Sequence, residues 1–188
     1  MTQVAGCALG DVRSSPSDDA EQGVQAVVAL GSNLGDRLAH LAAGAAALRD
    51  LGTVLAVSHV YETKPEGPVP QPPFLNAVGA LSTTLAPVEL LQRLLEAEKE
   101  RGRVRDQPGG PRTLDLDLLF YGNLIIRRPG LTVPHPRWKA RAFVCIPLLE
   151  ILPAMVDPES GLAIRELCGV GDAPAGKVER YPAPGWAE

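Results

Sequence analysis

The sequence QAVVALGSNLGDRLAHLAAGAAALRDLG, residues 25–52, contains a strand, a tight turn and a helix in one uninterrupted unit. Residues 25–30 are a short apolar run with two valines that ends at Gly31, which predicts a buried strand. Asp36 is placed to cap the N-terminus of the following helix, and Gly52 closes it. We predict this helix over residues 37–51 because apolar side chains recur there every three or four positions: Leu38, Leu41, Ala45 and Leu48.

The rest of the chain continues the alternation of strands and helices. Further strands are predicted over residues 53–61, 74–83, 114–121 and 123–127, and helices over residues 87–101 and 142–151. A proline-rich loop is expected at residues 63–73, a basic loop at 102–111 and a loop with a helical turn at 132–141. The order β-α-β-β-α-β predicts a ferredoxin-like fold. This is an α+β domain whose antiparallel sheet is flanked by helices in three layers, α/β/α.

Composition indicates a globular protein with one domain. The 188 residues are 45% hydrophobic and 21% charged, and the longest apolar stretches are about half of a membrane-spanning helix, which excludes a span. We expect a disordered arm over residues 1–23, one folded domain over residues 24–168 and a flexible tail over residues 169–188. The three cysteines lie far apart without a CxxC pair, which favours a reducing cytoplasm over a disulfide framework.

The charge is unevenly distributed along the chain. The net charge is −4, yet residues 99–141 hold ten basic and four acidic side chains, a local charge of +6. The remaining residues carry eight basic and eighteen acidic side chains, a charge of −10. A locally basic but globally acidic chain favours a small anionic ligand over a long polyanion. The alternative is an ordinary solvated basic face.

Two carboxylates lie close together in the predicted strand around residues 114–121. Residues i and i+2 of a strand point to the same side, so Asp115 and Asp117 project together while the leucines between them face the core. Two desolvated carboxylates repel each other unless a divalent cation lies between them, and their hard oxygens suit Mg²⁺. The alternative is a wet sheet face with two solvated aspartates.

Arginines precede this carboxylate pair. Arg112 lies three residues before Asp115, and Arg103 and Arg105 lie upstream in the basic loop. Guanidinium groups bind phosphate through forked hydrogen bonds, and phosphoryl transfer depends mainly on positioning and charge stabilisation. The combination indicates phosphoryl transfer rather than exposed surface arginines. No P-loop, GxGxxG or HExxH motif accompanies it.

Two further features are compatible with a nucleotide or a flat heterocycle. His135 lies between two prolines, which restrict its backbone, so it either contacts a nucleotide or has a structural role. Phe74 and Asn76 share one side of a predicted strand and would suit a flat ring with donor and acceptor edges. By themselves, these two residues are better explained as a core phenylalanine and an edge asparagine.

Six segments together resemble the hydroxymethyl-dihydropterin pyrophosphokinases of folate biosynthesis. They span residues 25–158 in the order typical of that family, and GPRTLDLD is highly specific. The segments are ALGSNLGD (29–36), YETKPEGP (61–68), FLNA (74–77), GRVR (102–105), GPRTLDLD (110–117), and LTVPH (131–135) leading to RAF (141–143). The family transfers the β,γ-pyrophosphoryl group of ATP to the hydroxymethyl oxygen of a reduced pterin and releases AMP.

The resemblance implies roles for individual residues, as well as ATP as co-substrate and two Mg²⁺ ions held by Asp115 and Asp117. The implied catalytic residues are Arg103, Arg112, Asp115 and Asp117. The implied ATP-binding residues are Leu91, Glu98, Arg105, Arg112, Leu118, Thr132, His135 and Arg141. The implied pterin-binding residues are Thr63, Pro65, Glu66, Phe74, Asn76 and Phe143. The expected partners are ATP and the reduced pterin, without nucleic acid or membrane, and the expected state is a cytoplasmic monomer.

The sequence departs from the family pattern at several positions. The loop before Gly110 lacks a tryptophan common in the family and is one residue short. Gly130 stands where an arginine often contacts ATP, and Arg127 and Arg128 are the candidates to replace it. Phe74 replaces a common tyrosine, which removes a hydroxyl group but keeps the aromatic ring.

Three other functions remain as alternatives. An RNA-binding module is compatible with the fold, but no aromatic RNP1 strand flanks the basic loop and the net charge is negative. A metal-dependent phosphatase or nuclease could use the same pair of aspartates, and would release inorganic phosphate without an acceptor. A catalytically inactive relative would bind ATP without turnover.

Overall fold

The computed structural model describes residues 23–65, 70–103, 110–169 and 178–188. Its elements, in chain order, are β1 (Val24–Ser32), α2 (Arg37–Leu51), β2 (Thr53–Val57), β3 (Tyr61–Thr63), β4 (Phe74–Thr83), α3 (Pro87–Glu100), β5 (Asp115–Tyr121), β6 (Ile126–Arg128), β7 (Leu131–Val133), the 3₁₀ turn η1 (Trp138–Ala140), α4 (Ala142–Ile151), α5 (Ile164–Leu167) and β8 (Val178–Arg180).

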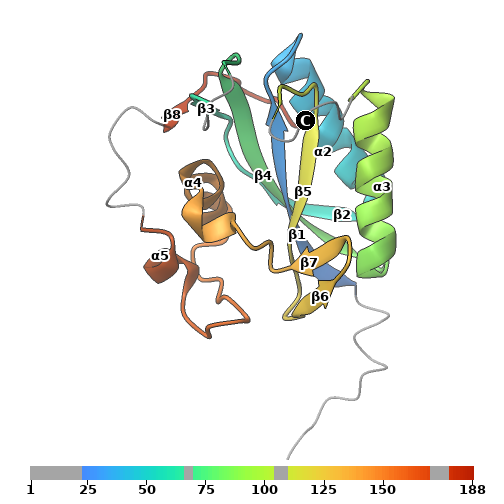
Figure 1. Cartoon of the computed structure of the whole chain (residues 1–188), viewed down its shortest axis with the longest axis vertical. Coiled ribbons are helices and arrows are strands. Elements are labelled where there is room, and N and C mark those ends of the chain that lie inside the picture. The colour runs from blue at the N-terminus through green and yellow to red at the C-terminus, as the bar shows by residue number, and fades with distance from the viewer. Residues whose placement is uncertain (1–22, 66–69, 104–109, 170–177) are drawn as a thin grey trace, which may run out of the picture.

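A six-stranded antiparallel sheet forms the centre of the molecule (Figure 1). The strand order is β5-β1-β4-β3-β8, and β2 also pairs with β4. Strand β1 therefore lies between β4 and β5, the two strands of the second β-α-β half of the motif. The predicted β-α-β-β-α-β order requires this arrangement. The register pairs Gly31 with Asn76 on one side and with Asp115 on the other. Polar residues of three strands thus meet at one end of the sheet.

Helices cover both faces of the sheet. One apolar core lies between the sheet and α2 and α3, and includes Leu41, Leu48 and Leu94. A second core lies between the opposite face and α4 and α5, where Phe120 contacts Trp138 edge-on with ring centroids 5.1 Å apart. Burial of each such large side chain contributes about 1.5–3 kcal/mol. The predicted three-layer α/β/α arrangement is confirmed.

The helix predictions agree closely with the structure. Helix α2 has the predicted bounds, and the Asp36 carboxylate caps it by accepting a hydrogen bond from the amide of Ala39 at 3.1 Å. Helix α3 begins at Pro87 and ends one residue before the predicted bound, while α4 occupies the predicted residues 142–151.

Two strand predictions were wrong in detail. The single strand expected over residues 53–61 is divided into β2 and β3, because Ser58 breaks the ladder: its hydroxyl accepts a hydrogen bond from the amide of Val78 and donates one to the carbonyl of His59. The strand expected over residues 123–127 is β6, which pairs with β7 in a separate two-stranded sheet. The turn between them contains Gly130 at φ +82°, a backbone conformation that glycine adopts readily.

The C-terminal end of the chain differs from the expected flexible tail. Val178–Arg180 form β8, and Tyr181 and Trp186 pack against the core on the side of the sheet that α2 covers. The expected disordered arm, residues 1–23, lies almost entirely outside the described residues. Among the described residues, no helix is long and apolar enough to cross a membrane.

Candidate active site

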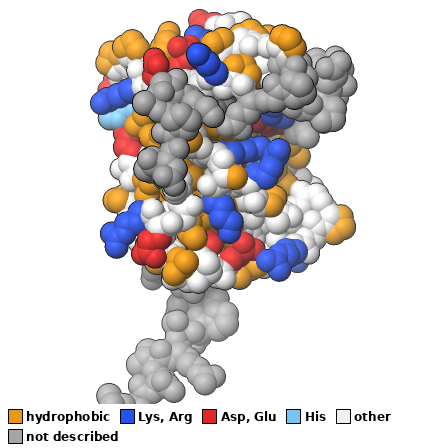
Figure 2. Space-filling view, turned by 60° about the vertical axis from the view of Figure 1, so that its left-hand side comes forward, with side chains coloured by type: hydrophobic (Ala, Val, Ile, Leu, Met, Phe, Trp, Pro, Cys, Tyr) orange, Lys and Arg blue, Asp and Glu red, His pale blue; other side chains and the backbone are white. Residues whose placement is uncertain are grey.

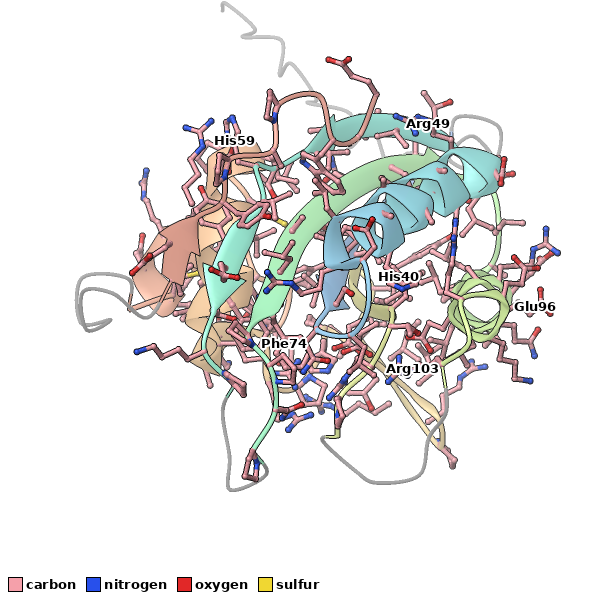
Figure 3. All side chains as sticks on the ribbon, turned by 90° about the horizontal axis from the view of Figure 1, so that it is seen from above. His40, Arg49, His59, Phe74, Glu96 and Arg103 are labelled. Atoms are coloured by element: carbon pink, nitrogen blue, oxygen red, sulfur yellow. The ribbon has the colours of Figure 1, made fainter. Side chains whose placement is uncertain are left out.

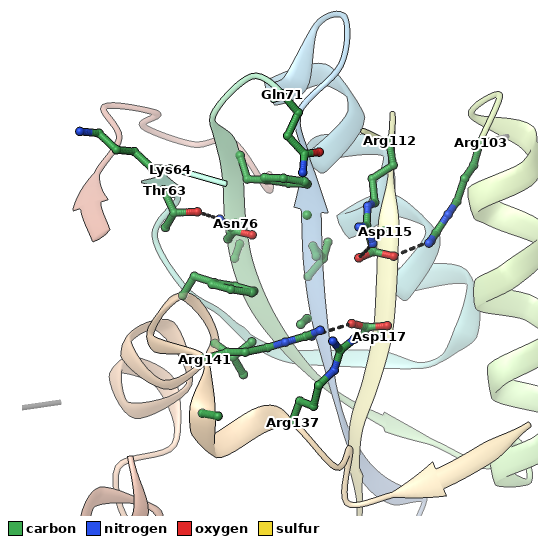
Figure 4. A pocket seen from close by; sticks show the side chains of 18 residues that line it. Thr63, Lys64, Gln71, Asn76, Arg103, Arg112, Asp115, Asp117, Arg137 and Arg141 are labelled. Carbon is green, nitrogen blue, oxygen red and sulfur yellow. Dashed lines mark hydrogen bonds and ion pairs between the residues drawn. The ribbon is translucent and has the colours of Figure 1, made fainter. Parts of the chain in front are cut away.

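A pocket of about 650 Å³ opens at the end of the sheet where β1, β4 and β5 meet (Figure 4). Phe74 and Arg103, both labelled in Figure 3, line it from β4 and from the chain that follows α3. Its charged lining consists of five basic and two acidic side chains: Lys64, Arg103, Arg112, Arg137, Arg141, Asp115 and Asp117. This excess of positive charge favours an anionic ligand.

Asp115 lies between two arginines. Nη1 of Arg103 is 2.5 Å from one carboxylate oxygen of Asp115, and Nη1 of Arg112 is 2.7 Å from the other. Nε of Arg112 also donates to the carbonyl of Gly110 at 3.2 Å. The free protein therefore neutralises Asp115 with guanidinium groups that could instead bind phosphate.

Arg103 is positioned by the end of α3. Gly102 has φ +72°, and the amides of Gly102 and Arg103 donate to the carbonyls of Lys99 and Glu98, as in a Schellman motif. The carboxylate of Glu98, only 2% exposed, forms an ion pair with Arg103 and accepts from the amide of Leu116 at 2.8 Å. Glu98 thereby connects α3, β5 and the arginine.

Asp117 has a second set of partners. Nη1 of Arg141 donates to its carboxylate at 3.2 Å, and Nε2 of His135 lies 3.9 Å from the same oxygen. Nδ1 of His135 accepts from the amide of Arg137, so a neutral ring carries its proton on Nε2, toward Asp117. Burial lowers the pKa of His135, although the charge of Asp117 acts in the opposite direction.

Aromatic and amide groups form the other half of the pocket. Phe74, Asn76, Thr63 and Phe143 line it, and Nδ2 of Asn76 donates to the hydroxyl of Thr63 at 2.9 Å. The guanidinium carbons of Arg112 and Arg141 lie 5.7 Å and 5.5 Å from the ring centroids of Phe74 and Phe143, respectively. The anion-binding half and the aromatic half of the pocket are therefore in direct contact.

Asn33 joins the two halves of the pocket through hydrogen bonds. This side chain, 1% exposed, donates to Gln71 at 3.0 Å and to the carbonyl of Pro72 at 3.2 Å. Its oxygen accepts from the amide of Arg112 at 2.7 Å. The segment before Phe74 and the segment before Asp115 are consequently held by a single amide.

The structure brings together most of the site residues named from the sequence. Nine of them line the pocket: Thr63, Phe74, Asn76, Arg103, Arg112, Asp115, Asp117, Arg141 and Phe143. Glu98 and His135 contact this group through Arg103 and Asp117. Leu118 lies in the core, and Leu91 packs against it. Thr132 is exposed on β7, and Pro65 does not line the pocket. Glu66 and Arg105 lie outside the described residues.

Sequence reasoning missed three polar residues of the pocket, Lys64, Gln71 and Arg137. Arg137 was counted in the basic region but assigned no role, although its position two residues after His135 was the available signal. Lys64 and Gln71 lie within the proline-rich loop and carried no signal of their own. Arg127, considered as a replacement for the missing arginine at position 130, instead pairs with Glu159 at 2.7 Å.

The carboxylate pair fits a magnesium ion. Among the described residues no three His, Cys, Asp or Glu side chains are grouped closely enough to hold a metal. Mg²⁺ commonly takes one or two carboxylates and completes its coordination with waters and substrate phosphates. Asp115 and Asp117 meet that requirement, and the arginines beside them can turn to the phosphates.

The pH dependence of stability should reveal the burial of His135. In the unfolded chain, His135 takes up a proton near pH 6.5, whereas burial opposes its protonation in the folded protein. The free energy of unfolding should therefore decrease as pH falls below 6.5. His135→Asn, whose amide can still accept from Arg137, should show a smaller decrease between pH 7.5 and 5.5. Urea unfolding at both pH values measures this difference, and equal decreases would contradict the assignment.

The face of the molecule seen in Figure 2 carries basic side chains in separate groups, with acidic and apolar side chains between them. On the part of this face that belongs to described residues, the basic side chains do not form the continuous track that a long nucleic acid requires. An α+β fold whose cationic pocket holds two carboxylates beside an aromatic recess defines an enzyme for a small phosphorylated substrate.

Comparisons with known proteins identify the family. The family model described as 7,8-dihydro-6-hydroxymethylpterin-pyrophosphokinase (HPPK) matches residues 27–153. The 2-amino-4-hydroxy-6-hydroxymethyldihydropteridine pyrophosphokinase of Pseudomonas aeruginosa is 44% identical over 157 residues, covering 82% of this chain and 95% of that protein. The enzyme of the same name from Haemophilus influenzae is 44% identical over 139 residues, covering 73% and 87%. The chain therefore belongs to the 7,8-dihydro-6-hydroxymethylpterin pyrophosphokinase family.

Solved structures support the fold. The crystal structure of Plasmodium falciparum HPPK-DHPS wild type with STZ-DHP matches with a TM-score of 0.64 at 15% identity, covering 79% of this chain and 43% of that one. The chain thus spans less than half the length of this solved relative, and the likeness concerns the fold alone. Together the comparisons confirm the predicted fold, family and enzyme class: the chain is a pyrophosphokinase, a transferase of folate biosynthesis.

Proposed function

We propose that this enzyme transfers the β,γ-pyrophosphoryl group of ATP to the hydroxymethyl oxygen of 6-hydroxymethyl-7,8-dihydropterin. The oxygen attacks the β-phosphorus, the bond from this phosphorus to the oxygen bridging to the α-phosphate breaks, AMP leaves, and the hydroxyl proton is released. The observation that carries the proposal is the contact between the two halves of the pocket, in which the guanidinium groups of Arg112 and Arg141 lie against the rings of Phe74 and Phe143.

At the phosphate end, Arg103, Arg112 and Arg141 would exchange their carboxylate partners for phosphate oxygens. All three are paired with Asp115 or Asp117 in the free protein, so their charge is already held where the polyphosphate would lie. Once this exchange is made, charge held at the reaction centre stabilises the transition state without further movement during the chemical step. We assign Arg103 and Arg112 as catalytic residues and Arg141 to ATP binding.

Asp115 and Asp117 would hold magnesium, and we propose two ions. When bound, Mg²⁺ would offset phosphate charge and lower the pKa of the attacking hydroxyl group. The carboxylates of the two aspartates are paired with arginines in the free protein and would be paired with the metal once it is bound. Glu98 keeps Arg103 in place during this exchange, because its carboxylate is buried and anchored to the amide of Leu116.

The adenosine end would lie beyond Asp117, toward His135. The neutral ring of His135 carries its proton on Nε2, where it would be available to the nucleotide. His135 is held beside β5 by a 2.9 Å hydrogen bond from its amide to the carbonyl of Leu119. The remaining proposed ATP contacts are Leu91, Leu118, Thr132 and Arg105, of which Leu91 and Leu118 would act as apolar walls.

The pterin would lie between the rings of Phe74 and Phe143. Asn76 would bind its edge, with Thr63, Pro65 and Glu66 alongside. A flat, electron-poor heterocycle stacks well on aromatic faces, and a buried amide recognises its donor and acceptor edge. Lys64, Gln71 and Arg137 complete the lining around these groups.

We propose that the protein acts as a monomer, because the described residues of this chain already supply both the cationic and the aromatic half of the pocket. We also propose a cytoplasmic location. Cys145 and Cys168 are buried and remain free thiols, as suits a reducing compartment.

The reaction is tested by incubating the protein with ATP, Mg²⁺ and the reduced hydroxymethyl-pterin, and resolving the nucleotides by chromatography. We expect AMP in amounts equal to the pyrophosphorylated pterin, and no AMP when the pterin is omitted. ADP as the product would contradict pyrophosphoryl transfer. Inorganic phosphate formed without the pterin would favour the phosphatase alternative.

A further inference from the structure

We propose that residues 178–188, the C-terminal strap, are a positioning element for the pterin subsite. The strap holds β3 against β4 and so sets the hydroxyl of Thr63, which orients the amide of Asn76. This inference rests on the proposed function, because it assigns the strap to pterin binding. The strap lies outside residues 27–153, the part of the chain that the family model matches.

Strand β3 is short and depends on neighbours on both sides. Its three residues pair with β4, where Thr63 lies opposite Phe74 and Tyr61 opposite Asn76. On the other side they pair with β8, where Thr63 lies opposite Val178 and Tyr61 opposite Arg180. Without β8, this three-residue strand would become an edge with half of its hydrogen-bonding groups unpaired.

The rest of the strap anchors the residues that lead into β3. The amide of Tyr181 donates to the carbonyl of Val60 at 2.8 Å, and Nε1 of Trp186 donates to the carbonyl of Ser58 at 3.1 Å. The side chains of Tyr181 and Trp186 also pack against the core on the side of the sheet that α2 covers. The strap therefore holds the whole run from Ser58 to Thr63.

Arg37 extends this support to the loop that follows β3. Its guanidinium carbon lies 5.9 Å from the ring centroid of Tyr181. Nη1 pairs with Glu62 at 2.7 Å and donates to the carbonyl of Pro73 at 2.9 Å. Glu62 lies in β3, and Pro73 directly precedes β4. A displaced strap would therefore loosen the segment between these two strands at both of its ends.

The effect on the pocket passes through Thr63 and Asn76. Thr63 is 5% exposed, and its hydroxyl oxygen accepts the hydrogen bond that Nδ2 of Asn76 donates. Oδ1 of Asn76 therefore lies on the side of Gly31, a residue that itself lines the pocket. A Cβ atom added to Gly31 would lie 3.4 Å from this oxygen. The amide thus presents an acceptor to the pterin. If β3 moves, this orientation is lost, whereas Arg103 and Asp117 stand on other elements and keep their places.

The test uses two strap variants and one control. Trp186→Phe keeps the aromatic packing but removes the hydrogen bond to Ser58, and a chain ending at residue 177 removes the strap. We expect the KM for the pterin to rise about fivefold in the first and more than about tenfold in the second, because each lost hydrogen bond contributes about 1 kcal/mol. The kcat and the KM for ATP should stay within about twofold. Glu179→Gln, an exposed change in β8 that keeps the backbone pairing, should match the wild type.

A direct measurement separates this inference from the proposed reaction. Pterin affinity is titrated with a non-hydrolysable ATP analogue present, and hydrogen exchange is followed at residues 58–63. Weaker pterin affinity with faster exchange supports the positioning role, even if the wild type fails to produce AMP, which would count against the proposed function alone. Unchanged pterin affinity, or equal changes in both substrate affinities, would overturn the inference and leave the strap a purely structural element.

Discussion

Asp117→Asn is expected to lower kcat about 1,000-fold while leaving the protein folded. The change keeps the size of the side chain but removes the negative charge proposed to hold magnesium beside the polyphosphate. Asp117 is a third exposed, and its partner Arg141 keeps its contact with the ring of Phe143, so the melting temperature should stay within a few degrees. Steady-state kinetics with ATP and the pterin, together with a thermal melt, give both quantities.

Asp115→Asn should behave similarly, since both arginines that flank Asp115 lose the same carboxylate charge. The matched control is Asp50→Asn, an identical chemical change at an exposed position near the end of α2, which should leave kcat unchanged. If either site variant retains a tenth of the wild-type kcat, the assignment of the carboxylate pair to catalysis is wrong.

Gly52→Ala should destabilise the fold by about 3 kcal/mol. A Cβ atom at this position would lie 2.2 Å from the carbonyl oxygen of Ser82 and 3.0 Å from its carbon. Both are backbone atoms of β4, so the conflict is relieved only by moving the central sheet. The φ of Gly52 is 164°, an extended conformation open to any residue, so the expected loss is steric. Urea unfolding measures the free energy change.

Gly44→Ala is the comparison for this prediction. The three atoms nearest to its Cβ would be side-chain tips, those of Leu30, Leu114 and Leu116 at 3.0–3.3 Å, and alanine favours the helix by about 1 kcal/mol over glycine. A change within about 1 kcal/mol is therefore expected. Equal losses in the two variants would show that the approach of Gly52 to β4 is not the decisive contact.

The helices were predictable because their signals are local. Apolar spacing, the Asp36 cap and Pro87 depend only on neighbours within a few residues, and α2 has the predicted bounds. Gly52 shows the limit of such reasoning. The sequence indicated a helix-terminating glycine, whereas the structure shows that the backbone of β4 leaves no room for a side chain there.

Strand pairing was less predictable. Hydrogen bonds between strands join residues far apart in the sequence, so periodicity indicates that a strand exists but not its partner. This is why β6 was not assigned to β7, and why β8 was taken as part of a flexible tail. The Ser58 hydroxyl that divides β2 from β3 acts through Val78, twenty residues away.

The site shows the same division. The alternation of a strand was enough to place Asp115 and Asp117 on one face, and Arg112 three residues earlier was close by necessity. The sequence also indicated an aromatic residue and an amide on one side of β4. Which groups meet across the sheet was decided by the tertiary fold, because antiparallel register sets Asn76 and Asp115 on either side of Gly31. Arg137 and Gln71 enter the pocket, and the carboxylate of Glu98 meets the amide of Leu116 in β5, only because packing brings distant segments together where local patterns carry no information.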